Sequence, residues 1–121
     1  MSNLVVSNIS DGTTSVGTGY VVNGSAKAWG ECNGDATLSD SFNITSGTDH
    51  GTGDYSYTLT NAFTNDNFSQ PSTVRVNSPS ARFIATTPSR RTASTLAAVT
   101  LNSTPTAVDV GHNISAFGDL A

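Results

Sequence analysis

Charged side chains are scarce in this sequence, and positive ones are the scarcest. Five Lys and Arg residues and nine Asp and Glu residues make up 12% of the 121 residues, and the formal net charge is −4. This is about half of the usual charged share. A protein that binds nucleic acid needs a basic stripe, so we expect no nucleic-acid partner. The one basic pair, Arg90 and Arg91, is interpreted as part of a solvated turn or as an ion-pair donor at an interface.

Cysteine is almost absent as well. Cys32 stands alone, which excludes an intrachain disulfide and a cysteine-based zinc site. No cysteine signature motif surrounds it, so we interpret Cys32 as a small buried group in a strand and not as a nucleophile. The sequence also lacks a signal peptide, a transit peptide and an apolar run of 18 residues. We therefore expect synthesis in a cytoplasm and no membrane partner.

Large apolar side chains are in short supply. The apolar residues amount to 36% of the chain, and 11 glycines are needed to bring the total near the usual range. A single domain of this length then has a thin core, which favours further burial against copies of itself or against a larger partner. The polar positions are dominated by Ser, Thr and Asn, a composition that suits extracellular β-proteins and virion proteins.

Period-two alternation predicts β-strands along most of the chain, whereas helical periodicity is nearly absent. Residues 93–101 are rich in Ala, but their β-branched residues and the lack of a cap favour a strand. Turn sequences, such as 33–35 and Asn77-Ser78-Pro79, separate the segments. Such spacing predicts an all-β fold, a single antiparallel β-sandwich or barrel-like domain. The predicted strands are 26–32, 37–45, 55–63, 73–76, 81–87, 93–101 and 107–118.

The same alternation assigns faces to the side chains. Residues 26–32 and 37–45 read as a hairpin. The side chains expected to share one face of their strand are Ala26, Ala28, Gly30 and Cys32, then Leu38, Phe42 and Ile44, and then Tyr55, Tyr57 and Leu59.

The first 19 residues differ from the rest. They contain one apolar cluster, Leu4, Val5, Val6 and Ile9, followed by a glycine- and threonine-rich run. A free terminal arm of this kind is expected to fray unless its own sheet, a sister subunit or a partner holds it. We therefore divide the chain into an N-terminal arm or attachment segment, 1–19, and a β domain, 20–121.

The stretch GTDHGTGDY, residues 47–55, is the strongest candidate for site chemistry. It places His50 between Asp49 and Asp54. A transition-metal site needs three or four converging ligands, and the other histidine, His112, belongs to a distant strand. Gly51 and Gly53 supply positive φ angles, and Asp residues bond nearby backbone N–H groups in turns. We therefore predict a tight turn with no metal, cofactor or catalytic residue.

The run from residue 20 to residue 68 resembles a domain found at the ends of phage tail fibres and in other virion appendage proteins. The motifs that carry the resemblance are Gly24 to Trp29, Phe42-Asn43, and Asp49 to Tyr55. This chain departs from the family at Gly30 and Cys32, where relatives carry larger apolar side chains. The resemblance implies a virion structural protein with an oligomeric β-fold and no catalytic residues.

We expect a small homotrimeric capsid decoration or cement protein that binds the major capsid protein or another virion protein from the outside. The alternative is a host-recognition module of a tail fibre or tail tip, in which Trp29, Tyr55, Tyr57 and the loop 64–70 contact a cell-surface glycan. We interpret Trp29 as a packing residue and do not expect an enzyme. The predicted interface residues are Leu4, Val5, Val6, Ile9, Trp29, Tyr55 and Tyr57.

Overall fold

The computed structural model describes residues 1–76 and 80–121. Most regular structure in these residues is β-strand, with one short helix, and neighbouring strands are antiparallel. The prediction of an all-β, antiparallel fold is confirmed. The predicted turn Asn77-Ser78-Pro79 lies outside the described residues. Within the described part of the chain, no helix has the length and apolar character needed to span a membrane.

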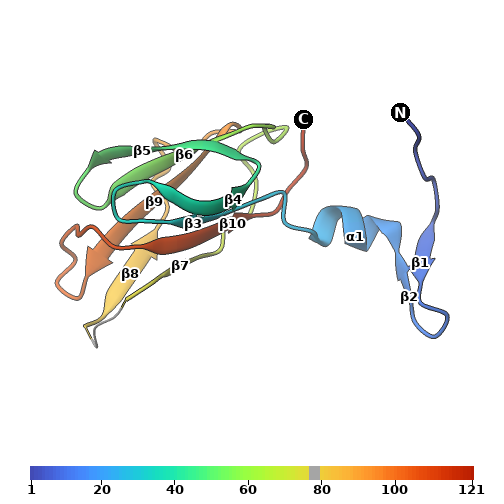
Figure 1. Cartoon of the computed structure of the whole chain (residues 1–121), viewed down its shortest axis with the longest axis horizontal. Helices are drawn as coiled ribbons and strands as arrows, with labels where there is room; N and C mark the ends of the chain where they lie inside the picture. The colour runs from blue at the N-terminus through green and yellow to red at the C-terminus, as the bar shows by residue number, and fades with distance from the viewer. Residues whose placement is uncertain (77–79) are drawn as a thin grey trace.

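The elements follow one another along the chain as Figure 1 labels them. They are β1 (Asn8–Ser10), β2 (Ser15–Gly17), α1 (Thr18–Gly24), β3 (Ala28–Cys32), β4 (Leu38–Phe42), β5 (Ile44–Gly51), β6 (Asp54–Leu59), β7 (Ser72–Val74), β8 (Arg82–Ala85), β9 (Thr95–Asn102) and β10 (His112–Ala116). Residues 93–101 are thus mainly strand, as the β-branched side chains predict.

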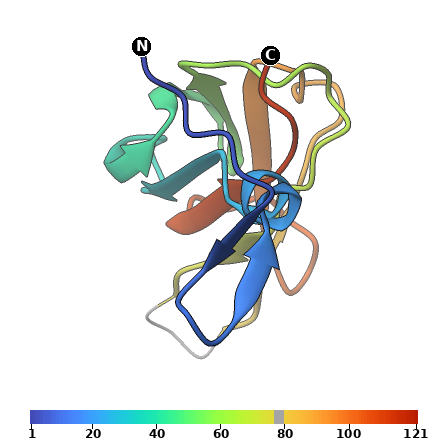
Figure 2. The same ribbon diagram turned by 90° about the vertical axis from the view of Figure 1, so that its right-hand side faces the viewer.

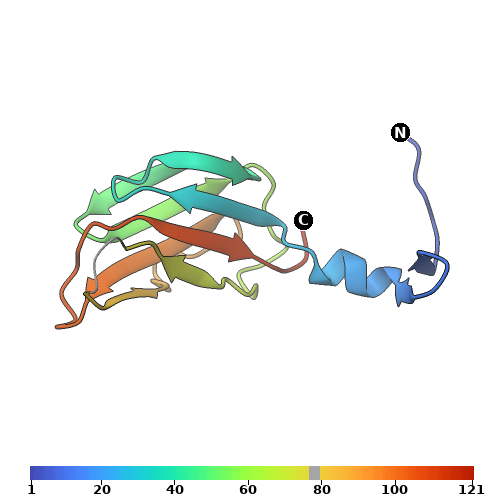
Figure 3. The same cartoon turned by 60° about the horizontal axis from the view of Figure 1, so that its bottom comes forward.

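Two four-stranded sheets enclose a common hydrophobic core. The first sheet has the order β4-β3-β10-β7 and the second has the order β5-β6-β9-β8. Figure 3 shows them as two layers at one end of the molecule. The buried side chains come from both sheets and from the loops that close the ends of the core: Ala28, Cys32, Ala36, Ile44, Tyr55, Tyr57, Leu59, Phe63, Phe68, Leu96, Ala98, Ile114 and Ala116.

The predicted face assignments hold for β3 and β6 and fail at the end of β4. Leu38 is half-buried and Ile44 is buried, but Phe42 is 54% exposed. Between Leu38 and Asp40 the register of β4 against β3 shifts by one residue, which puts Phe42 on the outer face opposite Trp29. Asn43, with a φ of 58° in the left-handed region, then breaks the alternation again before Ile44. At this point the chain leaves the first sheet and enters the second.

Asn43 fixes this crossover with its side chain. Its Nδ2 donates to the carbonyl oxygens of Lys27 at 2.9 Å and Asn61 at 3.0 Å, and its Oδ1 accepts the backbone N–H of Asn61 at 2.7 Å. Asn tolerates positive φ better than most residues because its short polar side chain bonds locally. The side-chain amide of Asn43 therefore links the end of β4 to the residue before β3 and to the loop after β6.

Residues 1–25, here called the N-terminal segment, lie outside the two four-stranded sheets. β1 and β2 pair with each other as a two-stranded ribbon, and α1 follows directly. Figure 2, viewed from this end, shows α1 along its axis with the ribbon in front of it. No residue of α1 is buried. The helix runs to Gly24, so the segment outside the sheets extends past residue 19, where the sequence pattern had suggested a boundary.

The helix α1 has weak local support, which explains why the sequence pattern missed it. Gly17 occupies the N-cap position without a side-chain hydrogen bond, and the first turn contains no acidic residue. At the other end, Lys27 donates its ammonium to the carbonyl oxygens of Val22 and, at 2.8 Å, of Ser25. A lysine at a helix C-terminus satisfies carbonyls that have no partner within the helix.

The centre of the core is polar. His112 on β10 is fully buried, and its Nε2 lies 2.8 Å from the hydroxyl of Tyr57 on β6. Its Nδ1 lies 3.0 Å from the carbonyl oxygen of Val110, and its ring stacks on Tyr55 with 5.0 Å between centroids. Because that carbonyl only accepts, Nδ1 carries the proton in the neutral ring and Nε2 accepts from Tyr57. Burial lowers the pKa of His112 from 6.5, which favours this neutral form.

Stability should therefore fall as the pH is lowered through the range in which a free histidine takes up a proton. The unfolded chain binds a proton at residue 112 below about pH 6.5, whereas the folded chain resists it, so unfolding is favoured by up to about 1.4 kcal/mol per pH unit. The His50→Gln variant leaves His112 as the only histidine. Its free energy of unfolding, measured by denaturant titration, should be lower at about pH 5.5 than at about pH 7.5. Equal values at the two pH values would contradict this role of His112.

Candidate functional site

Two of the predicted interface residues lie in the core. Tyr55 and Tyr57 are 0% exposed because both point inward from β6 and the first sheet covers them. The hydroxyl of Tyr55 donates to the carbonyl oxygen of Gly34 at 3.0 Å and to Asp109 at 2.9 Å. The prediction that these tyrosines line an interface or contact a glycan is wrong for this fold. Their role is to fill the core and to join the two sheets.

The buried ionisable groups near the centre of the core are held in unreactive forms. Burial raises the pKa of Cys32 to about 11 and that of Tyr55 to about 12, and it also raises the pKa of Tyr57. A thiol is a nucleophile only as the thiolate, so Cys32 is inert at neutral pH. The interpretation of Cys32 as a small buried group in a strand is confirmed. This cluster stabilises the fold through its packing and hydrogen bonds.

The stretch GTDHGTGDY forms a shorter turn than the sequence predicts. β5 continues to Gly51 and β6 begins at Asp54, so Asp49 and His50 belong to a strand. Gly51 and Gly53 have φ angles of 129° and 68°, as the turn prediction requires. Among the described residues, no group of three or more His, Cys, Asp and Glu side chains is placed to hold a metal ion.

The polar side chains of this stretch have partners of their own. His50 Nε2 lies 2.8 Å from the Ser56 hydroxyl, and Asp49 accepts the backbone N–H of Gly51 at 2.8 Å. Asp54 forms an ion pair with Arg90, with 2.8 Å between Oδ2 and Nη2. The three side chains therefore do not converge on one point.

The arginine pair acts within the chain. Arg90 is the partner of Asp54, and the Arg91 guanidinium lies over the Phe68 ring, 4.0 Å from its centroid. Arg91 also donates to the carbonyl oxygen of Phe68. The two side chains thus hold the loop after β8 against the second sheet and the loop that contains Phe68.

The N-terminal segment carries a continuous set of exposed apolar side chains. Leu4 and Val5 are 85% and 90% exposed. A hollow of about 370 Å³ lies between the start of the chain and α1. It brings the four predicted apolar residues together with two that the sequence analysis missed, because α1 was not expected. Its lining consists of Leu4, Val5, Val6, Ile9, Thr18, Val21 and Val22.

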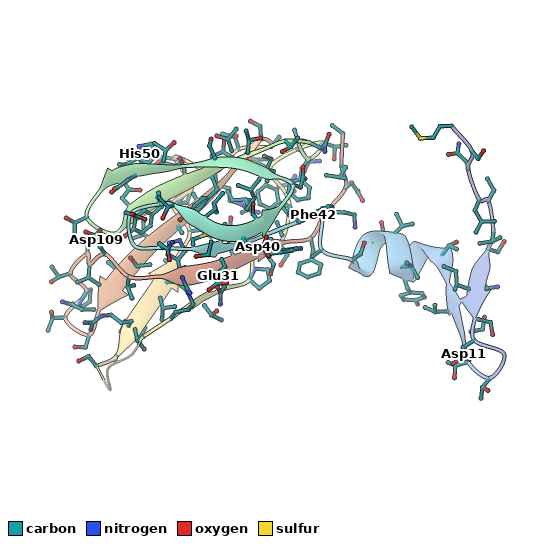
Figure 4. The ribbon with its side chains drawn as sticks, viewed as in Figure 1. Asp11, Glu31, Asp40, Phe42, His50 and Asp109 are labelled. Atoms are coloured by element: carbon teal, nitrogen blue, oxygen red, sulfur yellow. The ribbon has the colours of Figure 1, made fainter. Side chains whose placement is uncertain are left out.

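The outer face of the first sheet carries the second candidate surface, here called the aromatic face. Trp29 on β3 is 40% exposed and lies opposite Phe42 on β4 in the strand register. Glu31 and Asp40 are the next opposed pair on the same face, and Asn113 lies opposite Glu31 on β10. Figure 4 shows Phe42 at the end of the sheet near α1, with Asp40 and Glu31 farther along.

A shallow hollow of about 470 Å³ opens on the aromatic face beside Trp29. Its sides come from β3 and from the chain around the start of β7, and β10 forms its floor. Glu31 is held at its edge by an ion pair with Arg75. The lining residues are Trp29, Gly30, Glu31, Pro71, Ser72, Thr73, Asn113, Ile114 and Ser115.

Comparisons with protein families, with curated proteins and with solved structures found no match for this chain. A function must therefore be argued from the two surfaces, the N-terminal segment and the aromatic face.

The inert state of Cys32 can be checked by thiol labelling. In the folded protein at mildly alkaline pH, a disulfide reagent such as dithionitrobenzoate should modify Cys32 at least about a hundredfold more slowly than in denaturant, because the thiol is buried and protonated. The absorbance of the released thiolate gives both rates. Labelling of the native protein as fast as that of the unfolded chain would show that Cys32 is accessible and would contradict the description of the core.

Proposed function

We propose that this chain is a structural protein of a phage particle, a capsid decoration protein that attaches through its N-terminal segment and displays a β-sandwich outward. The observation that carries the proposal is the exposure of the N-terminal segment, whose apolar side chains stay open to solvent in the described part of the chain and whose helix has no buried residue. Large exposed apolar patches mark sites of protein association. The protein acts by binding, without catalysis.

The N-terminal segment is too small to be stable without a partner. Helices shorter than about 12 residues are marginal in water, and a single two-stranded ribbon is marginal as well. α1 has seven residues and β1 and β2 have three each. Burying one Val or Leu side chain contributes about 1.5–3 kcal/mol, so covering several of those around the hollow supplies enough free energy to order the segment.

The distribution of charge supports association between copies of the segment, and we propose a homotrimer. Asp11, in the β1–β2 turn, is the only charged side chain among the first 26 residues, whereas the other 13 of the 14 charged side chains follow. Like charges at close range oppose association. Asp11 does not line the hollow, so three N-terminal segments can meet there with little repulsion while the acidic sheets stay apart, and their shared apolar surface then docks on the major capsid protein.

Deleting residues 2–10 tests the attachment. The deletion removes Leu4, Val5, Val6 and Ile9 but none of the two four-stranded sheets, so the shortened protein should keep the β-strand signal of its circular dichroism spectrum and a cooperative thermal transition. It should fail to co-sediment with particles that lack the native protein. Retention on the particle would contradict attachment through this segment.

A point substitution gives a sharper comparison. Val21→Asp places a charge in the apolar hollow, whereas Thr13→Asp places the same charge at the exposed β1–β2 turn. Sedimentation equilibrium should show a trimer for the wild type and for Thr13→Asp, and a monomer for Val21→Asp, because a buried unpaired charge costs several kcal/mol. A trimer in all three proteins, or a wild-type monomer, would contradict association through the hollow.

A second candidate function is host recognition at a tail tip. It is favoured by the exposure of Trp29, the one predicted glycan contact residue among the three aromatics that stays at the surface. Binding of the labelled protein to host cells, with no binding to the capsid, would favour this candidate over decoration.

A further inference from the structure

We propose that the aromatic face is a binding site for neutral oligosaccharides. The ligand would lie across the strands of the first sheet, with one sugar ring in the hollow beside Trp29 and a neighbouring ring on Phe42. This inference does not depend on the attachment role of the N-terminal segment, because every residue that it uses lies in the first sheet or in the chain leading into β7.

The two aromatic side chains provide an apolar platform in water. Trp29 and Phe42 are opposed on adjacent antiparallel strands, and side chains in such pairs lie about 5 Å apart at their Cβ atoms. They are 40% and 54% exposed in a chain with only nine aromatic residues. Neither side chain belongs to the hydrophobic core, which Tyr55 and Tyr57 fill from the second sheet. The C–H face of a pyranose ring is the apolar surface that fits a flat aromatic platform.

A row of hydrogen-bonding groups runs beside the platform. Glu31 lies two residues after Trp29 and Asp40 two residues before Phe42 on the antiparallel strand, so they share the outer face about 7 Å farther along the strands. Asn113 continues the row on β10. Ionised carboxylates accept strong hydrogen bonds from hydroxyl groups, and an amide both donates and accepts. The arrangement offers an apolar surface to the face of a sugar ring and acceptors to its edge.

The acidic row is partly fixed before any ligand binds. Arg75 engages Oε1 of Glu31, and its Nη2 also donates to the carbonyl oxygen of Cys32 at 2.9 Å and to Asn33 Oδ1 at 3.2 Å. A guanidinium held at three points orients the carboxylate and lowers the entropy lost when a ligand binds. Asp40 is exposed, and its Oδ1 accepts the backbone N–H of Ser41 at 2.8 Å.

The hollow has a suitable size for one or two sugar rings. Small-molecule sites occupy about 300–1,000 Å³, and this hollow measures about 470 Å³. Ser115 lies opposite Trp29 and Thr73 lies opposite Asn113 in the strand register, so hydroxyl groups continue the polar lining across β10 and β7. The site is open along its length, which fits a chain of sugars better than a single enclosed molecule.

The charge of the aromatic face selects among ligands. Arg75 neutralises Glu31, and the opposed Asp40 keeps a carboxylate without an ion pair among the described residues, so the face disfavours phosphates, uronates and sialates. It would also repel the same face of a second copy, which argues against a subunit interface. Neutral hexoses and N-acetylhexosamines meet no such penalty. Affinity for one site should be weak, and display of several copies on one particle would strengthen it through multivalency.

The single tryptophan gives a direct assay with the whole chain. Trp29 is the only Trp, so a sugar that stacks on it changes the intrinsic fluorescence. A printed array of neutral, uronate-containing and sialylated oligosaccharides would identify the best neutral probe, and fluorescence titration with that probe would measure its dissociation constant. We expect a saturable change with a neutral oligosaccharide. No binding to any neutral probe, or preference for anionic probes, would overturn the proposal.

Substitutions test whether individual residues of the aromatic face contribute to oligosaccharide binding. Phe42→Ala and Asp40→Asn should each weaken binding by at least about tenfold, as expected for loss of one stacking or charged hydrogen-bond contact. Phe83→Ala is the matched control, because Phe83 is also 54% exposed but lies on β8 of the second sheet. Binding unchanged in Phe42→Ala, or lost equally in Phe83→Ala, would overturn the proposal.

Trp29→Ala separates this inference from the proposed attachment. It should abolish array binding while leaving the trimer and particle co-sedimentation intact. Dissociation of the trimer by Trp29→Ala would instead show that the aromatic face is a subunit interface and would overturn the carbohydrate site. Failure of Val21→Asp to alter assembly would count against the proposed function and leave the carbohydrate assay unaffected.

Discussion

The hydrogen bond between Tyr57 and His112 is the interaction on which the rest of the fold depends. It joins β6 of the second sheet to β10 of the first across the centre of the core. With few large aliphatic residues, the chain fills its interior with two tyrosines and a histidine and satisfies their polar atoms internally. A buried polar group without a partner costs about 1–3 kcal/mol, so this network requires one register of the sheets.

This filling of the core has a consequence for the surface. Because Tyr55 and Tyr57 occupy the space between the sheets, Trp29 and Phe42 are left on the outer face, and the apolar residues of the N-terminal segment are not recruited to the core. The molecule therefore has two separate exposed apolar surfaces, the hollow of the N-terminal segment and the aromatic face. We propose that the first serves assembly and the second ligand binding.

Period-two alternation was sufficient to predict the strand content, the inward face of β3 and β6, and the buried state of Cys32. The conclusion that residues 47–55 form a turn also follows from their glycines, although the turn is shorter than expected. These features depend on local chemistry. Local patterns therefore predicted most of the fold class and the apolar residues of the N-terminal segment, but not α1 or the outward position of Phe42.

The remaining features depend on contacts between distant residues. Phe42 was expected inside because alternation cannot anticipate the extra residue of β4 between Leu38 and Asp40 or the left-handed Asn43. The helix α1 was missed because it lacks capping residues. Tyr55 and Tyr57 were chosen as surface residues by type, although their own alternation placed them with Leu59 on one face. The opposition of Glu31 and Asp40 requires the register of β3 on β4, which the turn at Ala36, with φ of 65°, helps to set.

The central claim is that the chain works through surfaces that its fold leaves uncovered, first of all the N-terminal segment. Hydrogen–deuterium exchange of the particle-bound protein, compared with the same protein free in solution, tests this claim most directly. The account predicts strong protection of the backbone amides of residues 4–22 on the particle, with little change in the buried strands β6 and β9. Equal and rapid exchange of residues 4–22 in both states would contradict it.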